Sequence, residues 1–326
     1  MKIAVYSPNW IGDSVLALPF IKALKTRYPN ATLYIFCKEW VSDIYRNHPD
    51  IDNIISVQKA SLDSFIGTIK CGFKLRKIKL DYFFTLTDSF RSALVLRISG
   101  SLKTIGYKSQ MRSFLLTDSR SKSKLTIHRS KKYLDLVSAH EKLTIKSCLY
   151  ISPNEKKWGL KEMKKIGMDK PIGLFPFSVS NKRTISKSTI TKWIQNSKND
   201  YLVFGSRNDI QKGKNLIDSC QKLSIKLICG KYTLRQSIIL ISLCKYALAA
   251  DSGLGHISAA LGVPTVSFFG VGSLSVTGPI GKKVKIFKHC YPCKKDLCED
   301  SNKEVFCLEK ISKQDIEHAV KKLAKK

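Results

Sequence analysis

The feature that most restricts the fold of this chain is the alternation of short apolar runs with amphipathic stretches along both halves. Such alternation is typical of parallel sheets whose strands are connected by helices. In the first half, the expected strands are residues 2–8, 32–38, 52–57, 81–87 and 103–107. In the second half, they are residues 171–177, 201–206, 226–230, 246–251 and 264–270. The sequence therefore predicts an α/β protein with two Rossmann-like domains.

The length of 326 residues also favours two domains, because one hydrophobic core rarely serves so long a chain. A helix is expected over residues 14–27, and an amphipathic closing helix over residues 313–326. The stretch from Ser152 to Lys170 is polar, rich in lysine and flanked by prolines, which favours a linker. We expect an N-terminal domain over residues 1–160 and a C-terminal domain over residues 161–326.

The formal net charge of +32 is spread over both halves and is supplied mostly by lysine. This distribution fits a protein that works at an anionic surface or on an anionic substrate, and it also fits a lysine-rich genomic composition. The chain opens directly on a strand-like run, so a cytoplasmic protein is expected. Residues 258–281 lack charged side chains, but several Gly and Pro residues divide them, so any membrane contact is expected to be peripheral.

One candidate site follows the strand that ends at Ala250, where Asp251 and Ser252 precede a helix-forming run. A strand-to-helix turn of small residues directs backbone N–H groups and the positive end of the helix toward an anion. Gly253 and Gly255 would allow a phosphate to approach the backbone closely. We therefore interpret this turn as a phosphate-binding or sugar-binding site.

Two other interpretations of the same turn are a helix cap and a serine nucleophile. The less favoured alternative is that Asp251 or Ser252 caps the helix without any ligand. A serine nucleophile is disfavoured, because the nucleophile elbow requires G-x-S-x-G and Ser252 lacks that context. His256, one turn into the helix, is either a ligand contact or an ordinary helix residue.

Three further stretches place polar residues where expected strands end. Asp13 follows the first strand and is either a helix cap or a carboxylate that takes a proton from a hydroxyl. The Lys182–Arg183 pair follows the strand over residues 171–177, at the edge where open α/β sheets bind ligands. Two cations there would stabilise a diphosphate leaving group. Gly205 ends the neighbouring strand and would form the floor for a base or ribose.

The chain contains ten cysteines, and four of them form one C-x2-C-x4-C-x8-C cluster. This spacing is compatible with a four-thiolate structural zinc or iron–sulfur site, with reduced cysteines packed in a loop, or with redox-dependent pairing. The cluster consists of Cys290, Cys293, Cys298 and Cys307.

Taken in order, these motifs resemble glycosyltransferase family 9. The stretches are NWIGDSVLALP, the Lys182–Arg183 pair after a P-F-S loop, FGSRND, ADSGLGHISAALGVPTVSFFG and TGPIG. They cover nearly the whole chain, and the similarity is greatest to heptosyltransferases of the second type. Two departures are Thr184 and Ile185, which replace the aromatic and proline residues common after the basic pair, and the loop that follows Gly270.

The resemblance implies a GT-B fold, in which two Rossmann-like domains face each other across a cleft. It further implies inverting transfer from ADP-heptose to a Kdo/heptose–lipid A acceptor, without a metal for catalysis. By the same resemblance, Asp13 is the general base, and Asn9, Arg91 and Arg112 bind the acceptor. For Arg91 and Arg112, ordinary surface arginines are an equally good interpretation. The donor site that the resemblance implies consists of Lys182, Asp251, Ser252, Gly253, Leu254 and His256. The strand-end patterns add Arg183, Gly205 and Gly255 to it.

An acceptor of this type is anchored in the inner leaflet, so the enzyme is expected at the cytoplasmic side of the inner membrane. A basic cluster at residues 70–79, interleaved with Phe65, Ile69 and Phe73, is a candidate surface for anionic lipid, and a solvated helix face is the alternative. A second functional hypothesis is another nucleotide-sugar transferase for surface glycans. A basic nucleic-acid-binding protein is a third, disfavoured because no nucleic-acid module is recognisable.

Overall fold

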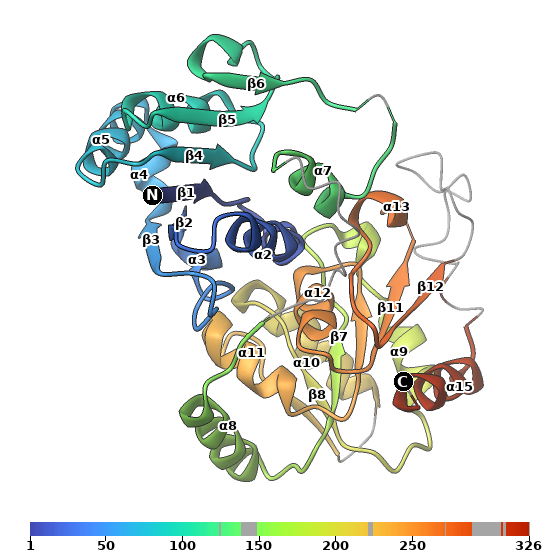
Figure 1. The fold of residues 1–326 in the computed structure, drawn as a ribbon. Helices are drawn as coiled ribbons and strands as arrows, with labels where there is room; N and C mark the ends of the chain where they lie inside the picture. The colour runs from blue at the N-terminus through green and yellow to red at the C-terminus, as the bar shows by residue number, and fades with distance from the viewer. Residues whose placement is uncertain are drawn as a thin grey trace. The chain divides into compact units, whose positions relative to one another are not determined.

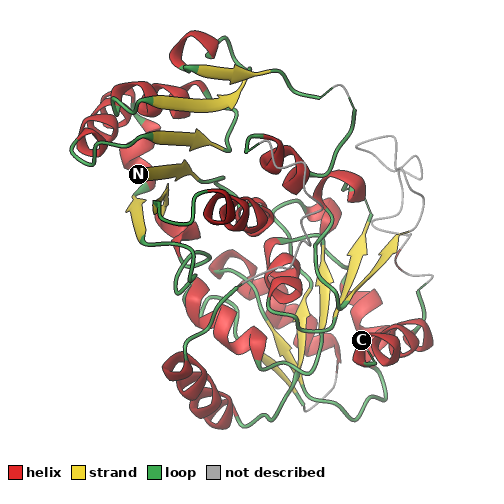
Figure 2. Cartoon of the chain, in the orientation of Figure 1, coloured by secondary structure: helices red, strands yellow, loops and turns green. Residues whose placement is uncertain are grey.

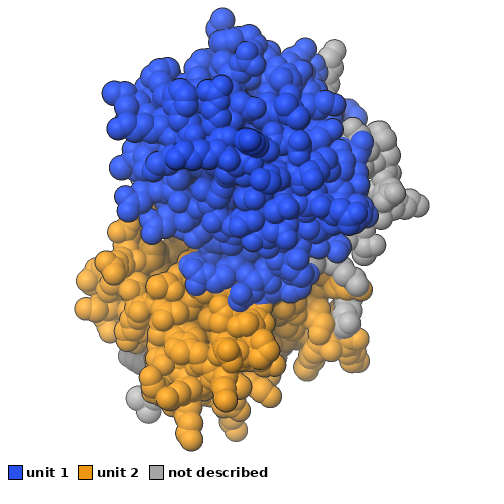
Figure 3. Space-filling model, turned by 60° about the vertical axis from the view of Figure 1, so that its left-hand side comes forward, with its two compact units in different colours: residues 1–150 blue, residues 151–326 orange. Residues whose placement is uncertain are grey.

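The computed structural model describes residues 1–123, 125–137, 149–220, 224–270, 272–288, 308 and 311–325. The chain divides into two compact units, Met1–Tyr150 and Ile151–Lys326, which Figure 3 distinguishes by colour. Each unit is built around one six-stranded sheet. In the described ranges, no helix is both long and apolar enough to cross a lipid bilayer.

Both sheets are fully parallel and have the same strand order. The strands of the first unit are β1 (Lys2–Tyr6), β2 (Thr32–Lys38), β3 (Asn53–Val57), β4 (Tyr82–Thr85), β5 (Lys103–Tyr107) and β6 (Asp118–Arg120). The strands of the second are β7 (Ile172–Phe175), β8 (Tyr201–Val203), β9 (Ile225–Leu227), β10 (Ala247–Ala250), β11 (Thr265–Phe269) and β12 (Val284–Lys288). The first sheet runs β3-β2-β1-β4-β5-β6, and the second, taken from its other edge, runs β9-β8-β7-β10-β11-β12 (Figure 1). Each unit therefore has the doubly wound Rossmann order.

Helices connect the parallel strands, as the alternation of apolar and amphipathic stretches along the chain predicted (Figure 2). Those of the first unit are α1 (Ile11–Leu16), α2 (Leu18–Arg27), α3 (Glu39–Ser42), α4 (Lys59–Asp63), α5 (Phe65–Arg76), α6 (Phe90–Ile98) and α7 (Arg129–Asp135). Those of the second are α8 (Pro153–Ile166), α9 (Lys187–Ile194), α10 (Ile210–Cys220), α11 (Leu234–Ser242), α12 (Gly253–Ala260), α13 (Leu274–Thr277) and α15 (Lys313–Ala324). Instead of one helix over residues 14–27 there are two, because Pro19 lies in the first turn of α2 and the chain breaks at Ala17.

Alternate residues of the strands in the first unit pack into separate cores on the two faces of the sheet. Phe36 and Phe83 belong to the core that α5 and α6 cover. On the opposite face, the ring of Phe84 meets Phe20 of α2, with 5.5 Å between centroids. Burial on both faces explains why these strands read as continuous apolar runs.

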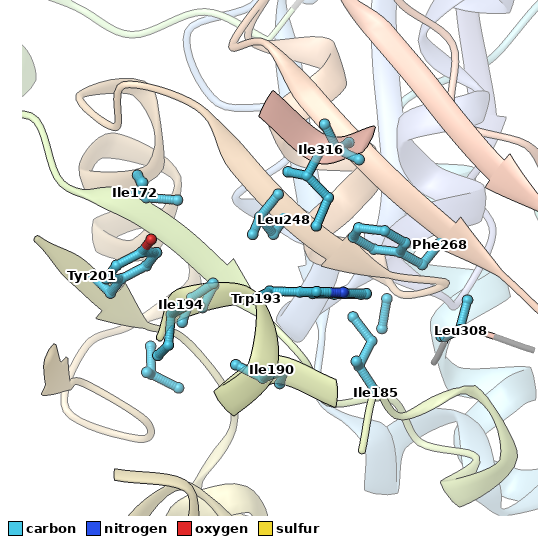
Figure 4. Packing of buried hydrophobic residues seen from close by; sticks show 14 of the residues in the cluster. Ile172, Ile185, Ile190, Trp193, Ile194, Tyr201, Leu248, Phe268, Leu308 and Ile316 are labelled. Carbon is cyan, nitrogen blue, oxygen red and sulfur yellow. The ribbon is translucent and has the colours of Figure 1, made fainter. Parts of the chain in front are cut away.

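In the second unit, Trp193 of α9 is the centre of a buried cluster (Figure 4). Its indole stacks on Phe268 of β11 at 4.4 Å between centroids, and its Nε1 donates to the carbonyl of Ile311 at 2.8 Å. Ile316 of α15 joins the same cluster. The expected closing helix thus forms, and it completes the core of this unit.

The expected linker is helical instead. Ser152 and Glu155 form a capping box that begins α8, and Arg235 of α11 donates to Glu155 at 2.8 Å. The helix therefore belongs to the second unit, and the division falls at residues 150 and 151. Strands β6 and β12 were not predicted, because β6 (DSR) contains no apolar residue and β12 (VKIFK) mixes apolar residues with lysine.

Candidate active site

The strand order places one candidate site in each unit. In a doubly wound sheet, ligands bind outside the carboxyl ends of the strands, where the direction of winding reverses. That reversal lies between β1 and β4 in the first unit and between β7 and β10 in the second. Asp13 follows β1, and Asp251 follows β10. Each predicted carboxylate is therefore at the reversal point of its own sheet.

Asp13 is the third residue of α1, and its carboxylate is held by an arginine. The helix begins after Trp10, whose side chain makes no capping hydrogen bond, while Arg129 Nη1 donates to Asp13 Oδ2 at 2.7 Å. The Asp13 side chain is only 16% exposed. Burial raises the pKa of Asp13 above its ordinary value, and the charges of Arg129 and Lys132 oppose the increase. A carboxylate with a raised pKa is suited to accept a proton.

A second carboxylate, Asp88, follows β4 and is paired with several cationic side chains next to the same reversal point. Lys122 and Lys132 each approach Asp88 Oδ2 at 3.0 Å, and Arg112 lies 3.7 Å from Oδ1. Burial raises the pKa of Asp88, but the hydrogen bonds from Lys132 and Lys122 outweigh it and leave the pKa below its ordinary value. With Arg129, four cations face two carboxylates, so this edge favours an anionic ligand.

The predicted acceptor residues are in different environments. Arg91 is exposed in the first turn of α6. Arg112 has no exposed surface and donates to the carbonyls of Tyr107, Thr87 and Ser89. It is therefore neither a surface arginine nor a direct contact for a bound acceptor, and its role is to hold the loop that follows β4.

Asn9, the remaining predicted acceptor residue, lies in the loop that follows β1. Its side-chain oxygen is buried without a hydrogen-bond partner among the described residues. Its backbone carbonyl accepts from Trp40 Nε1 at 2.8 Å. Buried polar atoms usually have partners, so the Asn9 side chain has an unused hydrogen-bonding group at this edge.

In the second unit, the loops after β7 and β10 meet around Asp251. Ser178 Oγ donates to the Asp251 carbonyl at 3.1 Å, and Arg183 Nη1 lies 3.5 Å from Asp251 Oδ2. The Asp251 side chain is 5% exposed, whereas that of Arg183 is 46% exposed. Burial raises the pKa of Asp251, and Arg183 opposes the increase. The structure thus brings together two predicted residues from separate motifs.

The turn after Asp251 is not a side-chain cap. Ser252 is the N-cap residue of α12, but it makes no side-chain cap hydrogen bond, and its Oγ is buried without a partner in the described chain. Gly253 and Leu254, in the first turn of α12, are partly buried. His256 is buried, with 6% of its surface exposed. The capping interpretation is wrong for Ser252, and a helix N-terminus without a side-chain cap presents backbone N–H groups suited to an anion.

Two of the predicted glycines are explained by packing. A Cβ on Gly205 would lie 2.7 Å from Cys229 Sγ, and one on Gly255 would lie 3.1 Å from the Cβ of Ala249. A side chain at position 205 would force neighbouring atoms to shift, and one at position 255 would be tightly packed against Ala249. Lys182 is exposed beside Arg183, in a single 3-10 turn at residues 181–183.

The expected metal cluster of Cys290, Cys293, Cys298 and Cys307 lies outside the described residues. Within the described ranges, no group of three or more His, Cys, Asp and Glu side chains could hold a metal ion. Of the scattered cysteines, Cys37, Cys71, Cys229 and Cys244 are buried and Cys220 is partly buried, which fits small core residues.

Comparison with known proteins decides the family. The profile described as glycosyltransferase family 9 (heptosyltransferase) matches residues 69–305. The chain belongs to glycosyltransferase family 9. It is 27% identical over 317 residues to lipopolysaccharide heptosyltransferase 2 of Escherichia coli (strain K12), and 88% of each chain is covered. It is 26% identical over 314 residues to the protein of that name from Salmonella typhimurium (strain LT2), with the same coverage.

A solved structure supports the fold of this family 9 glycosyltransferase. The structure of E. coli ADP-heptose LPS heptosyltransferase II superposes with a TM-score of 0.85 at 24% identity, and covers 99% of this chain and 98% of that one. The two Rossmann-like units are thus those of the GT-B fold that the sequence resemblance implied.

Sequence reasoning missed the partners of both carboxylates in this glycosyltransferase. Arg129 and Lys132 belong to a short basic run, and 116 positions separate Arg129 from Asp13, so no local pattern links them. Asp88 lies three residues after the end of β4, and that position was the available signal.

Proposed function

We propose that this glycosyltransferase transfers heptose from ADP-heptose to the inner core of lipopolysaccharide, with inversion at the sugar carbon. The observation that carries the proposal is the buried, arginine-paired carboxylate at the reversal point of each sheet, in a chain whose relatives are named lipopolysaccharide heptosyltransferases. Asp13 acts on the acceptor hydroxyl, and Asp251 binds the donor.

Asp13 acts as the general base in the first unit. It removes the proton from the acceptor hydroxyl as the hydroxyl oxygen forms its bond to C1 of the heptose. The bond between C1 and the diphosphate oxygen breaks on the opposite face, and ADP leaves with the electron pair. The raised pKa that burial gives Asp13 increases its basicity for this step. The step uses no catalytic metal.

The second unit holds ADP-heptose. Arg183 and Lys182 neutralise the diphosphate, and backbone N–H groups at the start of α12 donate to its oxygens. Ser252 Oγ and Asp251 Oδ2, which lack hydrogen-bond partners in the described chain, bind hydroxyl groups of the nucleotide sugar. These contacts stabilise the charge that develops on the leaving group.

The acceptor is a Kdo/heptose–lipid A molecule with anionic groups. Lys122 and Lys132, on the exposed side of the Asp88 cluster, and the exposed Arg91 bind those groups. Asn9 offers its unpaired side-chain oxygen to an acceptor hydroxyl.

The enzyme meets this acceptor as a peripheral protein at the cytoplasmic face of the inner membrane. Helix α5 carries Phe65, Ile66 and Phe73, which are 56%, 67% and 53% exposed. Lys70 and Lys74 are exposed on the same helix. Apolar and basic side chains on one helix face are the combination that lies in an anionic lipid interface.

Calorimetry with the purified full-length protein tests the donor assignment. We expect ADP and ADP-heptose to bind, and UDP-glucose and GDP-mannose to bind at least about tenfold more weakly, a difference of 1.4 kcal/mol. Tighter binding of another nucleotide sugar would favour the alternative of a different surface-glycan transferase. Absence of binding to all four would reject a nucleotide-sugar enzyme and favour the alternative of a basic nucleic-acid-binding protein.

Asp13→Asn tests the base. Turnover with ADP-heptose and a heptose-Kdo acceptor should fall by about 10²-fold or more, while the Kd for ADP-heptose stays nearly unchanged. Asp118→Asn is the matched control, because Asp118 is also paired with an arginine in the first unit and is 42% exposed. Turnover at the wild-type rate in Asp13→Asn would remove Asp13 from the mechanism.

A further inference from the structure

The ion pair between Arg129 and Asp13 has a fixed geometry. Arg129 is the first residue of α7, and the next residue, Ser130, is fully buried and donates from Oγ to the carbonyl of Leu16 at 2.7 Å. This bond ties the start of α7 to the end of α1, the helix that carries Asp13. One turn further along α7, Tyr133 forms a side-chain hydrogen bond with Arg129. The guanidinium is therefore held in place from its own helix and from α1.

Within the described residues, Arg129 is the one hydrogen-bond partner of the Asp13 carboxylate, and it uses Oδ2. A carboxylate oxygen that accepts a charge-assisted hydrogen bond at 2.7 Å is fixed in direction. The second oxygen, Oδ1, has no partner in the described chain. The pair thus divides the carboxylate into an anchored oxygen and an available one.

We propose that Arg129 is a positioning residue for the transfer reaction: it anchors Asp13 by Oδ2 and leaves Oδ1 to take the proton of the acceptor hydroxyl. The inference rests on the proposed function for its chemical step. It adds a residue that no motif of the chain indicated.

The surroundings of Asp13 explain why a positive partner is needed. The side chain is 16% exposed, and burial favours the neutral carboxylic acid, which cannot act as a base. The charged and titratable groups that face it are Arg129, Lys132, Tyr133 and Tyr45. Tyr133 and Tyr45 are buried, and burial raises the pKa of both phenols, so they remain neutral.

Lys132 is a poor substitute for Arg129. Its ammonium is held 3.0 Å from Asp88 Oδ2, and it acts on Asp13 only through charge. Arg129 supplies both the charge and the direct hydrogen bond. Removal of Arg129 should therefore raise the pKa of Asp13 further and release the carboxylate from its fixed orientation.

The kinetic test compares Arg129→Gln and Arg129→Lys with the wild-type enzyme across pH. Arg129→Gln should lower kcat/KM at pH 7 about tenfold or more and move its acidic limb to higher pH, because less carboxylate is present. Arg129→Lys should restore part of the loss and move the limb back toward that of the wild type. The Kd for ADP-heptose should not change in either variant. Arg46→Gln is the control, because it removes an arginine paired with Asp43 in the same unit and leaves α7 intact.

A second readout does not depend on activity. In protein labelled with ¹³C at aspartate carboxyl groups, the Asp13 signal is identified by its loss in Asp13→Asn. Its titration midpoint should rise in Arg129→Gln and stay unchanged in Arg46→Gln. An unchanged midpoint together with an unchanged acidic limb would overturn the role of Arg129. A shifted midpoint in a protein that transfers no heptose would instead reject the proposed function and retain the ion-pair inference.

Discussion

Arg183 Nη1 lies 3.5 Å from Asp251 Oδ2, although the two residues come from loops after different strands of the second sheet. A nearly buried carboxylate is thus opposed by a half-exposed cation at the reversal point of the sheet. The same arrangement, Arg129 with Asp13, occurs at the reversal point of the first sheet. In each case the arginine counters the rise in pKa that burial gives to the carboxyl group.

Arg183→Gln should weaken the binding of ADP and ADP-heptose by about 10-fold to 100-fold, the range expected for loss of a hydrogen bond to a charged group. Calorimetry at fixed ionic strength measures the change. Lys165→Gln, which removes an ion pair with Glu162 on α8, is the control and should leave both Kd values unaltered. Equal effects of the two substitutions would mean that only net charge matters.

Gly272→Ala should impair donor binding by displacing Asp251, because a Cβ at this position would collide with Asp251 Oδ2. The expected result is a weaker affinity for ADP-heptose in a folded protein. Gly270→Ala is a close control, since a Cβ there meets no atom within 4 Å. If both alanine variants bind the donor like the wild type, the position of Asp251 is not critical for binding.

Arg112→Met should destabilise the first unit by about 3–5 kcal/mol, because it leaves the buried carbonyl of Tyr107 and the partly buried carbonyls of Thr87 and Ser89 without their donor. Hydrogen exchange of the β4 and β5 amides in the intact chain reports the loss. Arg91→Met, at an exposed position, should change stability by no more than about 0.5 kcal/mol. Its expected effect is a higher KM for the acceptor.

Replacement of Phe65, Ile66 and Phe73 by serine should weaken binding to vesicles that contain anionic lipid. Replacement of Lys70 and Lys74 by glutamine should do so more strongly at low salt, since electrostatic attraction is screened by ions. Vesicle sedimentation with neutral and anionic lipids measures both effects. Binding that is indifferent to all five substitutions would contradict a role for α5 at the membrane.

The Glu155–Arg235 ion pair should make the second unit sensitive to acid. Hydrogen bonds from Arg235 lower the pKa of Glu155 from an ordinary 4.5 to about 2. A lowered folded-state pKa stabilises the fold above the unfolded-state value, and this contribution is lost as the pH falls from about 4.5 toward 2. Hydrogen exchange of α8 and α11 amides should show the loss, and Glu155→Gln should flatten it.

Much of the architecture was predictable because strands buried on both faces need continuous apolar residues. The five runs of each half coincide with β1–β5 and β7–β11, whereas the edge strands β6 and β12 lack that signal and were missed. Residues 152–170 looked like a linker by composition, but a capping box and the Arg235 contact make α8 part of the second unit. Composition alone does not reveal such a contact.

The sequence by itself determined that two parallel α/β units form and that Asp13, Arg183 and Asp251 each follow a strand, because strand periodicity and turn residues are local properties. Only the tertiary structure decided which groups meet. Arg129 anchors Asp13, whereas Arg112 is buried and holds the loop that follows β4. Arg129 and Asp13 are distant along the chain, and the fold brings them together at one edge of the first sheet. The protonation and orientation of the proposed base depend on that meeting, so they are properties of the fold and not of any motif.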